Sequence, residues 1–159
     1  MIAETFYSFD TSSLLNGRRD LLPPTTFPGV WENIEEAIAD GQVRAIDLVR
    51  DELSAMEDEA HRWTRSHPGL FVELEQDVQR AARMVLQEHR KLIGVGSGRS
   101  GADPFVVALA MARGGAVVTE EIPSRSLAKP KIPDVCKALG IRSMNLIGYV
   151  QEQGWVFTN

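Results

Sequence analysis

Apolar and polar positions follow two different periods along this chain. Short apolar runs with strand-like composition predict strands over residues 5–10, 42–46, 116–120 and 143–150, the last with a short continuation. Apolar positions at helical spacing predict helices over residues 11–17, 30–41, 47–56, 57–67, 73–92, 103–115 and 132–141. Strands that alternate with helices in this way predict an α/β fold, with a central, mostly parallel sheet of four or five strands between two helical layers.

Proline and glycine mark the connections between these elements. They predict loops over residues 18–29, 94–102 and 121–131. The chain shows no internal repeat, no low-complexity tract and no shift in composition that would divide it. We therefore expect one domain that spans residues 1–159.

Composition narrows the class of protein. Of the 159 residues, 43% are hydrophobic and 25% are charged, as in ordinary globular proteins. The single cysteine, Cys136, excludes an internal disulfide bond and fits a reducing compartment. The first residues lack the basic region of a signal peptide, and no apolar run approaches the roughly 20 residues of a membrane helix. These features predict a cytoplasmic protein with no membrane association.

The net charge of −5 comes from 17 basic and 22 acidic residues. This balance argues against a protein that coats nucleic acid through a broad basic surface. It is compatible with an enzyme that grips a phosphodiester through metal ions held by carboxylates, because the acidic residues are then part of the site.

Four acidic residues fall near predicted strand ends. Asp10 ends the first strand, Glu52 lies in the helix after the second, Asp103 opens a helix, and Glu121 follows the strand after it. Ligand sites of parallel sheets lie beyond the carboxyl ends of the strands, so these acids have a topological reason to converge. Oxygen ligands alone suit Mg²⁺ or Mn²⁺, which would offset the repulsion between carboxylates.

Each of these acids also has a purely structural interpretation. Asp10 would be a turn residue and Glu52 a solvated surface residue. Asp103 would be a helix cap, because Pro104 follows it directly. Glu120 and Glu121 would be loop residues. The joint pattern therefore carries more weight than any single member.

Four segments, "FDTSSLLNG", "VRDEL", "ADPFVVALAMARGGAVVTEE" and "KIPDVCKALGI", together resemble the PIN-domain nucleases, which include the VapC-like toxin ribonucleases. They are most similar to a poorly characterised bacterial PIN-like branch with a carboxyl-terminal "IPDVC" stretch. The resemblance runs in order from Phe9 to about Ile147. It implies a compact PIN-like α/β/α domain, dependence on Mg²⁺ or Mn²⁺, and hydrolysis of RNA, commonly by the toxin of a toxin–antitoxin pair.

The resemblance also implies roles for individual residues. Asp10, Glu52 and Asp103 match the first three acids of the family, and Thr119 and Glu121 match its hydroxyl-x-acid pattern. The resemblance thus implies that Asp10 and Asp103 ligate the metal directly and that Glu52 and Glu121 complete its shell. Ser12 matches a small polar residue that supports the first acid. The family more often has aspartate as its last acid, so Glu121, Glu120 and Asp134 remain alternatives for the fourth position.

Substrate and partner expectations follow from the same comparison. Basic residues in the loops at the expected active edge would position the RNA backbone, and they are Arg18, Arg19, Arg125, Lys129 and Lys131. Each also has an ordinary role in solubility. The family implies an inhibitory antitoxin partner and a homodimer. The apolar tail residues Trp155, Val156 and Phe157 would form such a contact or pack back on the core.

Two other classes of function compete with a nuclease. The stretch Gly96–Gly101 fits G-x-G-x-x-G, which favours a nucleotide-binding domain, but no strand clearly leads into it. The third class is a catalytically silent interaction protein that keeps the fold. The sequence gives less support to nucleophilic catalysis than to these classes. Cys136 lies in an apolar helical segment, and the three histidines lie in the charged middle of the chain.

Overall fold

The structure, a computed structural model, describes residues 4–56, 58–93 and 101–158. Five short strands form one sheet in the order β3-β2-β1-β4-β5, and every paired neighbour is parallel. Their bounds are β1 Tyr7–Phe9, β2 Val43–Ile46, β3 Phe71–Val72, β4 Ala116–Val118 and β5 Ser143–Met144. The α/β prediction with a mostly parallel sheet of four or five strands is therefore confirmed.

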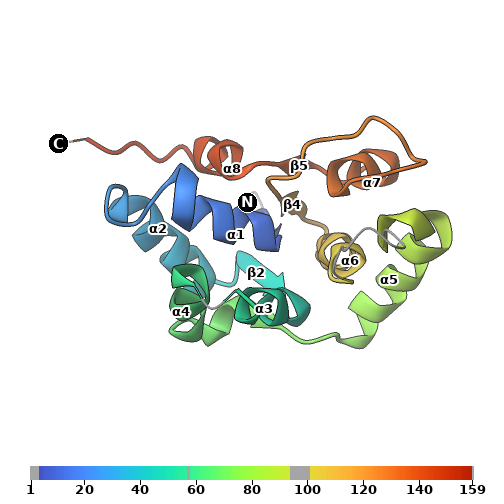
Figure 1. Cartoon of the computed structure of the whole chain (residues 1–159), viewed down its shortest axis with the longest axis horizontal. Coiled ribbons are helices and arrows are strands. Elements are labelled where there is room, and N and C mark those ends of the chain that lie inside the picture. The colour runs from blue at the N-terminus through green and yellow to red at the C-terminus, as the bar shows by residue number, and fades with distance from the viewer. Residues whose placement is uncertain (1–3, 57, 94–100, 159) are drawn as a thin grey trace.

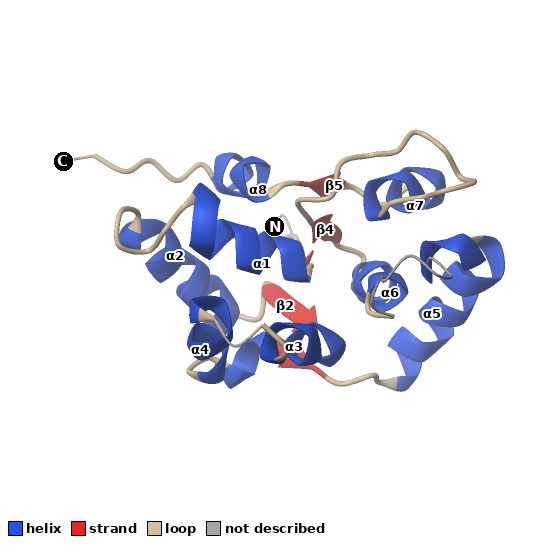
Figure 2. Ribbon diagram, viewed as in Figure 1, coloured by secondary structure: helices blue, strands red, loops and turns tan. Residues whose placement is uncertain are grey.

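Helices cover both faces of this sheet. The bounds are α1 Thr11–Asn16, α2 Pro28–Ala39, α3 Asp47–Ser54, α4 Glu59–Arg65, α5 Gln76–Glu88, α6 Asp103–Arg113, α7 Ile132–Leu139 and α8 Leu146–Gln153. A π-helical turn follows α1, and 3₁₀ turns precede β3 and follow α5. The strands lie between α1, α2 and α8 on one side and α5, α6 and α7 on the other (Figures 1 and 2). No helix in the described part of the chain has the length and apolar character needed to cross a membrane.

The inner strands and α6 form the centre of the core. β1, β2 and β4 are buried along most of their length, as expected for parallel strands covered on both faces. α6 lies against β1, β2 and β4 and packs on α5, and its residues Val106–Ala110 have no more than trace exposure. Its apolar character on all sides follows from this sandwiched position.

Two glycines set the join between α6 and β4. Gly114 ends α6 in the left-handed region, with φ of 64°. A Cβ atom at Gly115 would lie 2.2 Å from the carbonyl oxygen of Phe6, so only glycine lets the chain enter β4 this close to β1. The amide of Ala116 then donates to the same Phe6 oxygen at 2.8 Å.

Two predicted elements differ from the structure. The prediction of a strand over residues 143–150 is wrong beyond Met144, because α8 begins at Leu146. Asn145 caps this helix by accepting a hydrogen bond from the amide of Gly148 at 2.8 Å. The helix predicted over residues 73–92 is limited to α5 and a following 3₁₀ turn, and the edge strand β3 was not predicted.

Candidate functional site

Asp10 lies at the point where the strand order of the sheet switches from one side of β1 to the other. β1 has β2 on one side and β4 on the other, so the chain leaves its central strand toward both edges in turn. Asp10 follows β1 directly, caps α1, and donates its backbone N–H to the Val118 carbonyl at the end of β4, at 2.9 Å. In open parallel sheets such a switch point is where ligands bind.

The Asp10 carboxylate accepts three hydrogen bonds. Oδ1 accepts from the Thr11 amide at 2.8 Å, and Oδ2 accepts from the hydroxyls of Ser12 and Thr119, each at 2.8 Å. Ser12 comes from the first turn of α1, and Thr119 comes from the end of β4. The backbone of Ser12 also acts to lower the pKa of Asp10, so the start of α1 and the end of β4 both hold this carboxylate.

Ser12 and Thr119 also fix the segment that follows β4. The Ser12 hydroxyl accepts from the Glu120 amide at 2.9 Å, and the Thr119 hydroxyl accepts from the Glu121 amide at 3.1 Å. Each hydroxyl therefore donates to Asp10 and accepts from the backbone. This network joins α1, the end of β1 and the end of β4 around one carboxylate.

Burial and hydrogen bonds act in opposite directions on the carboxyl of Asp10. The residue is 3% exposed, and burial raises the pKa of its carboxyl above the usual value of 3.8, although the hydroxyl and amide donors act to lower it. A bound cation would oppose the effect of burial, because it stabilises the charged carboxylate.

Asp103 is held beside the same strand. It lies in the first turn of α6 and is 8% exposed. One turn later the carbonyl of Val106 accepts a 2.8 Å hydrogen bond from the hydroxyl of Ser8 in β1. This bond places the start of α6 against β1. The capping position belongs to Ala102, so the expectation that Asp103 is a helix cap is corrected by one residue.

Glu52 comes from the neighbouring strand–helix unit. It lies in α3, which follows β2 directly and packs on α1. The residue is half-buried, and its Oε1 atom is shielded from solvent. Because β2 is parallel to β1, α3 begins at the same edge of the sheet as α1.

The two glutamates after β4 point to different helices. Glu120 Oε2 accepts from the Leu146 amide at 2.7 Å and so satisfies a free donor at the start of α8. Glu121 Oε1 approaches the Ile132 amide at the start of α7, at 3.3 Å. Glu120 therefore contacts the start of α8 through a short hydrogen bond, whereas Glu121 contacts the start of α7 through a longer one.

Asp134 organises the loop before α7. Its carboxylate accepts from the amides of Ser124, Arg125 and Lys131 and from the Ser124 hydroxyl, at 2.8–2.9 Å. Burial acts to raise the pKa of Asp134, but these hydrogen bonds prevail and lower it to about 2. The geometry gives Asp134 a structural use, and its side chain is committed to residues 124–131.

The carboxylates are not gathered into a finished metal site. Across residues 4–56, 58–93 and 101–158, no three acidic, histidine or cysteine side chains lie close enough together to hold a metal ion as they stand. The donors nevertheless fit a hard divalent cation in chemical type, because Asp10 and Asp103 are buried carboxylates at one edge of a parallel sheet.

The basic residues expected to contact substrate differ in their placement. Arg18 is 8% exposed, and its guanidinium lies 4.7 Å from the Trp31 ring and 4.5 Å from the Trp63 ring. It also forms an ion pair with Glu59. The charged group of Arg18 is therefore used inside the protein, and its expected contact with substrate stays a prediction.

The remaining basic residues are more accessible. Arg19 is exposed and donates to Asp20 at 3.0 Å. Arg125 and Lys129 are exposed and Lys131 is half-buried in the loop before α7. Lys131 uses its backbone amide to bind Asp134 at 2.8 Å.

Some residues had been considered for nucleophilic catalysis or nucleotide binding. They are buried, packed against other side chains, or outside the described part of the chain. Cys136 is buried, as expected, and burial raises the pKa of its thiol to about 12, so it is not a nucleophile at neutral pH. His67 packs against Trp63, with ring centroids 4.9 Å apart. The glycine-rich stretch Gly96–Gly101 lies, apart from Gly101, outside the described residues.

Comparison with known proteins identifies the fold class and the family. The chain is similar to a chain in the crystal structure of VapBC2 from Rickettsia felis bound to a DNA fragment from their promoter, with a TM-score of 0.52 and 12% identity. The match covers 88% of this chain and 98% of that chain, and together with the parallel five-stranded sheet it supports a PIN-like fold. The chain belongs to the family described as a domain of unknown function, DUF4411, which matches residues 7–157. None of the curated proteins compared with the chain matches it.

Proposed function

We propose that this protein is a metal-dependent endoribonuclease that hydrolyses RNA phosphodiester bonds. The observation that carries the proposal is the buried Asp10 carboxylate at the switch point of the sheet, held in place by the hydroxyls of Ser12 and Thr119. The likeness in fold to a chain of VapBC2 supports the same class of protein.

Asp10 and Asp103 would hold an Mg²⁺ or Mn²⁺ ion directly, and Glu52 and Glu121 would complete or orient its water shell. When bound, such an ion activates water for attack on phosphorus and neutralises charge that develops on the phosphate. Because the acids do not form a group of three as described, side-chain rotation toward the ion accompanies binding in this proposal.

The chain's own groups prepare this site in three ways. The hydroxyls of Ser12 and Thr119 donate to Oδ2 of Asp10 and so fix the orientation of its carboxylate. The same hydroxyls hold the backbone of Glu120 and Glu121, which keeps Glu121 near the start of α7. The burial of Asp10 and Asp103 limits competing water and strengthens their attraction for a cation.

The biological setting that we propose is a toxin–antitoxin pair. The protein would be the toxin, an antitoxin protein would inhibit it, and it would act as a homodimer in the cytoplasm. The solved structure with a similar fold is that of VapBC2 bound to a DNA fragment from their promoter, which supports a partner of this kind. The exposed tail residues Val156, 81% exposed, and Phe157, 50% exposed, are available for such a contact.

Cleavage of structured and unstructured RNA by the purified protein tests the proposal. The reactions contain Mg²⁺, Mn²⁺ or a chelator, and they compare the wild type with Asp10→Asn and Asp103→Asn. Glu32→Gln, an exposed carboxylate on α2, is the matched control. We expect metal-dependent cleavage by the wild type and the control, and loss of cleavage in both aspartate variants.

One observation favours a second candidate, a catalytically silent PIN-like interaction protein. The described residues contain no ready group of three metal ligands, which is what relic acids would leave. In that case neither metal supports cleavage, and the protein binds a partner without RNA turnover. Tight nucleotide binding without cleavage would instead favour a nucleotide-binding domain. Cleavage that survives both aspartate substitutions would refute the assigned site.

A further inference from the structure

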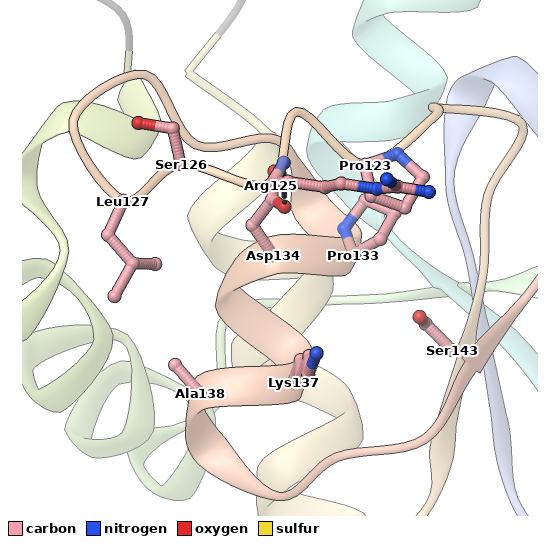
Figure 3. Close-up of a pocket in the computed structure, with 9 residues that line it drawn as sticks. All are labelled: Pro123, Arg125, Ser126, Leu127, Pro133, Asp134, Lys137, Ala138 and Ser143. Carbon is pink, nitrogen blue, oxygen red and sulfur yellow. Dashed lines mark hydrogen bonds between the residues drawn. The ribbon is translucent and has the colours of Figure 1, made fainter.

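A cavity of about 720 Å³ lies between the loop before α7 and the exposed side of α7. Residues of the loop 123–127, residues of α7 and Ser143 of β5 line it (Figure 3). A cavity of this size, with mostly apolar walls and a few polar groups, has the usual character of a small-molecule or nucleotide site.

The loop that forms one wall is held in a defined shape. Asp134 accepts hydrogen bonds from both ends of this loop, including the amides of Arg125 and Lys131, each at 2.8 Å. Arg125 has φ of 63°, a left-handed conformation that a residue other than glycine rarely adopts. Figure 3 shows its side chain extending toward the rings of Pro123 and Pro133. The backbone conformation therefore directs this cation to the cavity.

The cavity has a charged side and an apolar side. Arg125 and Lys137 provide two positive charges and Asp134 one negative charge, whereas Leu127 and Ala138 lie on the other side (Figure 3). The start of α7 does not provide a separate anion site, because the Lys131 and Ile132 amides already donate to Asp134 and Glu121. An anion would therefore be met by the side chains of Arg125 and Lys137.

This cavity adjoins a second one near the end of β4. A second cavity of about 400 Å³ shares Pro123, Pro133 and Ser143 with the first and reaches Thr119 and Glu121. Thr119 donates directly to Asp10. The charged side of the first cavity therefore adjoins the segment that carries Thr119 and Glu121.

We propose that the larger cavity binds one nucleotide of single-stranded RNA next to the bond that is cleaved. Arg125 and Lys137 contact its phosphate, and its base lies against the apolar side formed by Leu127 and Ala138. This inference rests on the proposed function, because it places the substrate relative to Asp10. Lys137 was not singled out by the sequence, since it reads as an ordinary exposed helix residue.

The observations favour RNA over an acidic peptide. A nucleotide carries one phosphate and one flat apolar face, which match two cations beside an apolar wall. An acidic peptide would match the two cations but would leave the apolar side formed by Leu127 and Ala138 uncovered, whereas a base covers it.

The test measures binding of a short fluorescent single-stranded RNA by anisotropy, with chelator present and at several salt concentrations. The variants are Lys137→Ala and Arg125→Gln, and Arg62→Ala, an exposed residue on α4, is the control. We expect each cavity variant to bind about tenfold more weakly, with the salt slope reduced by roughly 0.7 for a lost phosphate contact. The control should bind like the wild type.

Three outcomes separate this inference from the proposed function. Binding that both cavity variants retain, with an unchanged salt slope, overturns it, even where the wild type cleaves RNA. Displacement of the RNA by polyglutamate peptide as readily as by unlabelled RNA also overturns it. Binding that is lost in both variants of a protein that does not cleave RNA supports the cavity and refutes only the nuclease.

Discussion

Thr119 Oγ1 donates a 2.8 Å hydrogen bond to Asp10 Oδ2 across 109 positions of sequence. The bond joins the end of β4 to the end of β1, which are adjacent in the sheet. The bond is buried, and the Thr119 hydroxyl also accepts a hydrogen bond from the Glu121 amide. One threonine thus connects the first acid of the candidate site to the segment that carries the last.

Replacement of Thr119 by valine should destabilise the protein and perturb Asp10. The variant keeps the shape of the side chain but removes a donor to Asp10 and an acceptor for Glu121. We expect a loss of about 1–3 kcal/mol in the free energy of unfolding, measured by urea denaturation. The pKa of Asp10 should rise further, because the lost hydrogen bond favours the charged form. A variant as stable as the wild type would contradict this assignment.

Asp10→Asn should be more stable than the wild type at neutral pH when a chelator is present. Burial raises the pKa of Asp10, so the folded protein holds this proton more tightly than the unfolded chain does. The contribution of Asp10 to stability is therefore greatest below pH 3.8 and is lost as pH rises through the folded pKa. Denaturation across acidic and neutral pH should show the wild type losing stability relative to the variant. A difference that does not depend on pH would refute this account.

Substitution of Glu120 should mainly lower stability, and substitution of Glu121 should mainly lower activity. Glu120→Gln weakens the acceptor for the Leu146 amide at the start of α8, and we expect a loss of about 1 kcal/mol with RNA cleavage retained. Glu121→Gln should reduce cleavage while the unfolding midpoint changes little, because its bond to the Ile132 amide is long, at 3.3 Å. Paired denaturation and cleavage measurements decide this. The reverse pattern would identify Glu120 as the fourth acid.

Arg18→Gln should destabilise the protein without weakening RNA binding. The guanidinium lies between two tryptophan rings and pairs with Glu59, so its loss leaves a poorly filled space and a weakened ion pair. We expect a cost of about 2–4 kcal/mol, measured by thermal or urea denaturation. RNA affinity measured below the unfolding transition should match that of the wild type. A stable variant with weak RNA binding would support the substrate role.

The sequence was sufficient to predict the layers and the location of the strand ends. Parallel strands buried on both faces leave continuous apolar runs such as Ala116–Val118, and glycine and proline mark where the helices between them start and stop. Asp10 and Asp103 were predicted as site residues because acids at such boundaries are conspicuous. Both are buried, and the topology of a parallel sheet predicts that they lie at the same edge.

Other features depended on tertiary contacts that no local pattern records. Residues 143–150 have strand-like composition, but Asn145 and Glu120 together satisfy the amides of a helix that starts at Leu146. Arg18 was predicted in a solvated loop, whereas a π-helical turn directs it between Trp31 and Trp63. Asp134 was one of the alternatives for the fourth acid. Its structural use was missed because its four hydrogen bonds come from a loop whose shape could not be predicted.

The dependence of the RNA cleavage rate on Mn²⁺ concentration, measured for the wild type and Asp10→Asn, tests the central claim most directly. We predict that the wild-type rate saturates with Mn²⁺. The variant rate should fall by at least about a hundredfold at the same Mn²⁺ concentration, because a lost ligand costs at least as much as a lost supporting contact. Circular dichroism of both proteins verifies that the variant is folded. Two superimposable Mn²⁺ curves would show that Asp10 does not hold the ion and would contradict the proposal.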